Sequence, residues 1–90
     1  MPRKQVTILN ELGLHARAAT RLVECANRFD CKVSLNNEDR KVDGKSIMGL
    51  LMLAAGPGMR IEIETDGTDA EPALLALSDL IDSGFGESEI

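Results

Sequence analysis

The sequence predicts an α+β fold, an open-faced β-sandwich in which a four-stranded antiparallel sheet is covered on one face by three helices. Three observations support it. Alternating and helical segments follow one another in the order β-α-β-β-α-β-α. Each candidate strand has one apolar face, which is typical of antiparallel sheets. Finally, 90 residues with 43% hydrophobic content suit one compact core, so residues 1–90 are expected to be a single domain.

The first part of the chain supplies a strand, a loop and a helix. Residues 4–9 are expected to form the strand, because Val6 and Ile8 share one face and polar residues interrupt the run. A loop over 10–14 precedes a helix predicted over 16–28, where apolar residues recur at i, i+3, i+4 and i+7. The core-facing residues of this helix are expected to be Ala19, Leu22, Val23 and Ala26.

A β-hairpin is predicted next. Its first strand covers 32–36, with Val33 and Leu35 facing inward. Turn-forming residues over 36–39 then return the chain as a strand over 40–43.

A short apolar helix is predicted from 47 to about 54, with Ser46 as its N-cap. The segment is apolar all round, although only about a third of a helix surface can face a sheet. We expect Leu50, Leu53 and Ala54 to face the sheet. Four side chains then remain outside: Ile47, Met48, Leu51 and Met52. An exposed apolar patch usually marks a protein contact, so these four are the expected partner-binding residues.

The last strand and helix complete the pattern. The strand is expected over 60–65, where apolar residues alternate with glutamates. The helix follows a cap at Thr68 or Asp69 and ends at Gly84. Its core residues are expected to be Leu74, Leu77 and Ile81, flanked by Ala73 and Leu80.

Composition excludes several function classes. A net charge of −5 and only two aromatic residues, both Phe, argue against a nucleic-acid partner, which basic and stacking side chains would bind. We expect no membrane partner, because the chain shows no signal-peptide pattern and no long apolar run. Cys25 and Cys31 make no disulfide framework, so the predicted location is cytoplasmic, with both thiols free.

The only histidine, His15, lies at the predicted start of the first helix. The first N–H groups of a helix lack internal partners and attract anions, so the amides of Ala16 and Arg17 could receive a phosphoryl group held on His15. The Arg17 guanidinium could add a charge-assisted contact. On position alone, a histidine that merely caps the helix or lies on the surface is the simpler interpretation. We expect no metal and no cofactor, because His15 and the cysteines lack the spacing of a metal site.

Two motifs resemble a known family. Residues 12–19, Leu-Gly-Leu-His-Ala-Arg-Ala-Ala, resemble the active-site motif of HPr, the histidine phosphocarrier of the bacterial phosphotransferase system. Residues 44–50, Gly-Lys-Ser-Ile-Met-Gly-Leu, resemble the second-helix segment of the same family. The resemblance implies that phosphoenolpyruvate phosphorylates enzyme I, that enzyme I phosphorylates Nδ1 of His15, and that His15 passes the group to an enzyme IIA. It also implies a possible phosphoserine at Ser46, which requires a serine kinase.

One departure from the family pattern points to a branch. HPr commonly has proline directly after the active-site arginine, whereas this chain has Ala18. Together with Ala19 and the acidic tail, this resembles the nitrogen-related branch, often called NPr, in which the carrier serves regulation rather than sugar uptake.

Two alternatives stay open. The chain could be a general sugar-uptake HPr, or a binding module without catalysis that uses the patch over 47–52 to bind a regulator. An independent enzyme is less favoured than a phosphohistidine carrier, because the chain has no nucleotide loop and no pocket-forming insertion. An exchange protein needs its face free, so we expect a monomer.

Overall fold

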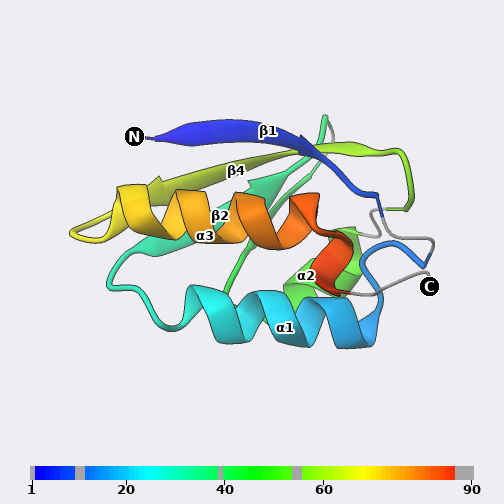
Figure 1. Ribbon diagram of the computed structural model, residues 1–90, viewed down its shortest axis with the longest axis horizontal. Helices are drawn as coiled ribbons and strands as arrows, with labels where there is room; N and C mark the ends of the chain where they lie inside the picture. The colour runs from blue at the N-terminus through cyan, green and yellow to red at the C-terminus, as the bar shows by residue number, and fades with distance from the viewer. Residues whose placement is uncertain (1, 10–11, 39, 54–55, 87–90) are drawn as a thin grey trace.

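A computed structural model describes residues 2–9, 12–38, 40–53 and 56–86 and confirms the predicted fold class (Figure 1). The elements are β1 (Arg3–Thr7), α1 (Ala16–Ala26), β2 (Lys32–Asn36), β3 (Lys41–Asp43), α2 (Ile47–Leu53), β4 (Arg60–Asp66), α3 (Ala70–Asp82) and a final 3-10 helix, η1 (Gly84–Gly86).

The four strands form one antiparallel sheet in the order β1-β4-β2-β3. Val6 of β1 lies opposite Ile61 of β4, and Leu35 of β2 lies opposite Ile63 of β4. These pairs share the buried face, because side chains alternate between the two faces of a strand. The helices lie on that face of the sheet (Figure 1).

The core-facing residues predicted for α1 are all buried. In α3 the prediction was partly wrong. Leu77 and Ile81 are fully buried, but Leu74 is only partly buried, whereas Ala73 is fully covered. Helix α3 packs closely on β1 and β4, so the small residue Ala73 lies on the helix face that contacts the sheet. The larger Leu74 lies at the border of that face and is only partly buried.

Several element ends differ from the sequence prediction. The first helix ends at Ala26 rather than Arg28, and β1 ends at Thr7 rather than residue 9. Helix ends fray and are capped by local bonds that a periodic pattern does not register. The expected inward position of Ala54 and the turn residue Asp39 lie outside the described residues.

The open face of the sheet holds a buried carboxylate, Glu64. Glu64 lies on the face away from the helices, as the alternation predicts, yet it is only 7% exposed. An ion pair with Arg3, at 3.4 Å, and another with Lys41, at 3.3 Å, flank its carboxylate. The long side chains of both cations are largely exposed, so they shield Glu64 while their charges compensate its burial.

The sequence analysis missed the way in which η1 closes the core. Phe85 is fully buried, and its backbone adopts φ of 61°, a left-handed conformation that is uncommon for residues other than glycine. The Arg21 guanidinium of α1 donates a hydrogen bond to the Phe85 carbonyl. This contact links η1, the last described element, to the first helix.

Candidate functional site

His15 is the N-cap residue of α1. Its backbone is extended, with φ of −84° and ψ of −178°, and its carbonyl accepts the first intrahelical bond, from the Ala19 amide, at 2.8 Å. The His15 Nδ1 atom accepts a hydrogen bond from the Arg17 amide at 3.2 Å. The simpler interpretation, in which the histidine caps the helix, therefore describes its geometry correctly.

The cap geometry also selects the tautomer of the ring. A nitrogen that accepts an amide proton is unprotonated, so this hydrogen bond selects the tautomer with a lone pair on Nδ1 and a proton on Nε2. The half-buried ring thus presents a nucleophilic nitrogen next to a helix N-terminus, where partial positive charge collects. A phosphoryl group bonded to Nδ1 would lie where the Arg17 amide already points.

The loop before His15 is held by the hydrophobic core. Leu14 is buried in the core, while Gly13 adopts φ of 68°, which lets the chain turn just before the cap. Ala18 and Ala19 are both buried beneath the first turn. Core packing therefore holds the residues on both sides of His15 in the chain, and three of the four residues that follow it are alanines.

The other predicted residues of this site lie in the first turn of α1. Ala16 and Arg17 are both exposed. The structure brings the Arg17 amide to the ring, and the Arg17 side chain is exposed at the start of the helix.

The predicted partner-binding residues form an exposed surface on α2, which we call the α2 patch (Ile47, Met48, Leu51 and Met52). Their exposed fractions are 38%, 68%, 37% and 58%. Leu50 and Leu53 are buried, as expected. Helix α2 contacts α1 and lies beside the half of α1 that begins at His15 (Figure 1). The α2 patch and the histidine are thus at the same end of the molecule.

Both ends of α2 are held by side-chain hydrogen bonds. At the start, the Ser46 hydroxyl accepts a hydrogen bond from the Gly49 amide at 3.0 Å, which confirms Ser46 as the N-cap. At the end, the Arg40 guanidinium donates to the Met52 carbonyl at 2.9 Å. The sequence analysis missed Arg40, since nothing in a local pattern indicates a contact with a residue twelve positions away.

A second missed residue is Leu12, which lies three positions before His15 and is 71% exposed. The one feature of the sequence that could have pointed to Leu12 is that it is an apolar residue in a predicted loop. It adds apolar surface on the loop that leads into His15.

The remaining chemical groups offer no second reactive centre among the described residues. In that part of the chain no cluster of three or more His, Cys, Asp or Glu residues is placed to hold a metal ion. Cys25 is buried, and burial raises the pKa of the half-buried Cys31 thiol above its ordinary value, which keeps that thiol protonated and weakly nucleophilic. The helices of the described ranges are not long and apolar enough to cross a membrane.

Known proteins match almost the whole chain. The family model described as PTS HPr component phosphorylation site matches residues 2–83. The phosphocarrier protein HPr of Neisseria meningitidis is 49% identical over 89 residues, covering 99% of this chain and 100% of that protein. The phosphocarrier protein NPr of Shewanella violacea is 45% identical over 85 residues, covering 94% of this chain and 93% of that protein. A crystal structure of HPr-C-His from Thermoanaerobacter tengcongensis superposes with a TM-score of 0.94 at 39% identity, covering 98% of this chain and 99% of that one.

Proposed function

This chain belongs to the HPr family of phosphocarrier proteins of the phosphotransferase system, and from that premise we propose that Nδ1 of His15 is the atom that carries the phosphoryl group. The observation that supports this assignment is the 3.2 Å hydrogen bond from the Arg17 amide to Nδ1. It orients the Nδ1 lone pair at the helix N-terminus, where an anion is stabilised once it forms.

The transfer needs few groups from this chain. The Nδ1 lone pair attacks the phosphorus on enzyme I, the bond from phosphorus to the donor breaks, and an N–P bond forms on His15. The Arg17 amide then donates to a phosphoryl oxygen instead of to Nδ1. The Ala16 amide in the same turn and the exposed Arg17 guanidinium supply further positive charge for the dianionic group. The reverse attack, by an acceptor on enzyme IIA, releases it.

The finer proposal is that this carrier serves the nitrogen-related branch, in the cytoplasm and as a monomer. Ala18 in place of the usual proline and the similarity to a protein named NPr support it. Ala18 is fully buried, so it would mark the branch without touching a partner. The relative named HPr supports the alternative, a general carrier for sugar uptake.

The two branches are separated by the choice of donor. With phosphoenolpyruvate present, we expect a nitrogen-related enzyme I to phosphorylate the chain faster than a sugar-type enzyme I, measured as initial rates by intact-mass spectrometry. A higher kcat/KM with the sugar-type enzyme would move the chain to the general branch, while leaving the carrier function intact. Sedimentation of the unmodified chain as a dimer would contradict the monomer proposal.

We assign the docking of both enzymes to the α2 patch. Met48→Glu places a charge on its most exposed residue and is expected to raise the KM for this chain in the enzyme I reaction about tenfold or more, with little change in kcat. Leu75→Glu is the matched control, because Leu75 is 62% exposed on α3, outside the α2 patch, and should leave KM unchanged. Equal effects of the two substitutions would contradict the assignment.

Ser46 is proposed as a regulatory phosphorylation site beside that patch. A phosphate there would be stabilised by the start of α2 but would place negative charge next to Ile47 and Met48. Ser46→Asp should therefore raise the same KM, and mass spectrometry of protein from cells should find the phosphoserine under some growth condition. Its absence under every condition would rule out the regulatory role.

A further inference from the structure

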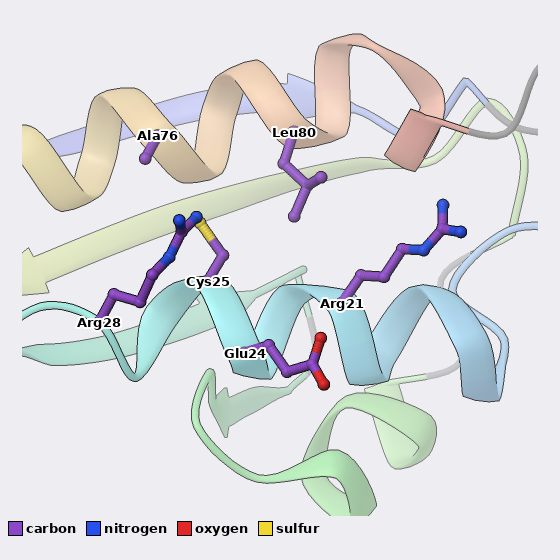
Figure 2. A pocket seen from close by; sticks show the side chains of 6 residues that line it. All are labelled: Arg21, Glu24, Cys25, Arg28, Ala76 and Leu80. Atoms are coloured by element: carbon purple, nitrogen blue, oxygen red, sulfur yellow. The ribbon is translucent and has the colours of Figure 1, made fainter.

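A cleft between α1 and α3 is unrelated to the His15 site. Its volume is about 480 Å³, within the range of small-ligand sites, and its lining residues are Arg21, Glu24, Cys25, Arg28, Ala76 and Leu80. It lies along the side of α1 that faces α3, whereas α2 lies against the opposite side of α1 (Figure 2).

The two helices contribute different chemistry to this cleft. Ala76 and Leu80 point from α3 toward α1 and form an apolar wall (Figure 2). Two arginines reach up from the α1 side, Arg28 at one end and Arg21 at the other. Glu24 also lines the cleft, and its carboxylate lies along α1 and does not point toward α3 (Figure 2).

The two arginines differ in whether their guanidinium groups already have a hydrogen-bond partner in the protein. Arg21 is half-buried, and its guanidinium donates to the Phe85 carbonyl, which fixes it at one end of the cleft. Arg28 is exposed, and within the described ranges its guanidinium has no carboxylate partner. The Arg28 guanidinium therefore lies next to the apolar wall without a direct ion pair to a described carboxylate.

The geometry points to a binding site for a small organic anion in this cleft. Its phosphate or carboxylate group pairs with the Arg28 guanidinium, which can accept a bidentate contact. Its compact apolar body packs on Leu80 and Ala76, and Arg21 adds positive field from the far end. Charge complementarity and the limited volume argue for a small molecule of this class as the occupant. The site does not depend on the role proposed for His15.

Phenyl phosphate is a suitable probe, because it joins an anionic group to a compact apolar ring. We expect it to shift backbone amide signals of the α1–α3 cleft in a ¹H–¹⁵N NMR titration of the full chain. Benzyl alcohol lacks the charge and inorganic phosphate lacks the ring, so each should bind more weakly than phenyl phosphate.

Two substitutions test the two halves of the cleft independently. Arg28→Gln removes the charge and should weaken binding about fivefold or more. Ala76→Leu fills the apolar wall and should weaken binding while all charges stay. Arg60→Gln is the control, since it removes an exposed arginine on β4, outside the cleft, and it should leave the affinity unchanged.

Three results would overturn the site. The first is the absence of amide shifts at saturating phenyl phosphate. The second is a set of shifts centred on His15 and Arg17, which would place the anion at the helix N-terminus instead. The third is an Arg28→Gln variant that keeps its native spectrum and binds with the original affinity, since the proposed ion pair would then contribute nothing.

Discussion

His15→Ala is expected to abolish phosphoryl acceptance while the domain stays folded. The chain has no other histidine, and no other described group shares the position of Nδ1 at a helix N-terminus. Losing the cap costs about 1 kcal/mol, against a total stability of about 5–15 kcal/mol for small domains. Intact-mass spectrometry after incubation with phosphoenolpyruvate and enzyme I should show one added phosphoryl group on the native chain and none on the variant.

His15→Asn separates the chemical role of this residue from its structural role. Asparagine is a good N-cap but has no nucleophilic nitrogen, so this variant should regain the stability lost in His15→Ala and still accept no phosphoryl group. Phosphorylation of either variant would contradict the assignment of His15. If the His15→Ala variant kept the full regulatory effect of the native chain in cells, the alternative of a binding module without catalysis would be favoured.

Phe85→Ala is expected to cost about 3–5 kcal/mol in the free energy of unfolding, which is the usual range for deleting a fully buried phenylalanine. Phe85 is 0% exposed and packs in the core, while its carbonyl holds the Arg21 guanidinium. Replacing the ring leaves a cavity under η1 that the surrounding α1 and α3 can fill only partly. Urea unfolding followed by circular dichroism measures the change.

The other phenylalanine of the chain provides the control. Phe29 packs against the core but is only partly buried, so Phe29→Ala should cost clearly less than Phe85→Ala. Equal losses for the two substitutions, or a loss below about 1 kcal/mol for Phe85→Ala, would show that η1 does not close the core.

The strands and the sheet could be predicted because their information is local. In β2 and β4, apolar residues alternate with polar ones, and the alternation states directly which face is buried. The exposed α2 patch followed from the same reasoning, since a helix that is apolar all round cannot bury its whole surface on a sheet.

What the sequence analysis missed depends on contacts between distant residues. Phe85 follows a glycine that ends α3, so its local pattern indicates a chain end rather than a core residue. The Arg21 guanidinium that binds its carbonyl is 64 residues away. Arg3 and Lys41 reach Glu64 from two different strands, which no periodic pattern shows.

The position of His15 at the start of the first helix was predicted from the sequence, but the geometry of its ring was not. A single histidine before a helix indicated where an anion would be stabilised, and the structure places His15 there as the N-cap. The sequence could not show that the Arg17 amide already contacts Nδ1, because that depends on the rotamer of the ring. It is this contact that favours Nδ1 over Nε2 as the proposed nucleophile.

The central claim is that Nδ1 of His15 carries the phosphoryl group and that the Arg17 amide stabilises it. The most direct test is ³¹P and ¹⁵N NMR of the chain phosphorylated by phosphoenolpyruvate and enzyme I. We predict that the phosphorus is bonded to Nδ1 and that the Arg17 amide proton shows one of the largest shifts on phosphorylation. Phosphorus on Nε2 or on Ser46, or an Arg17 amide signal that does not move, would contradict the account.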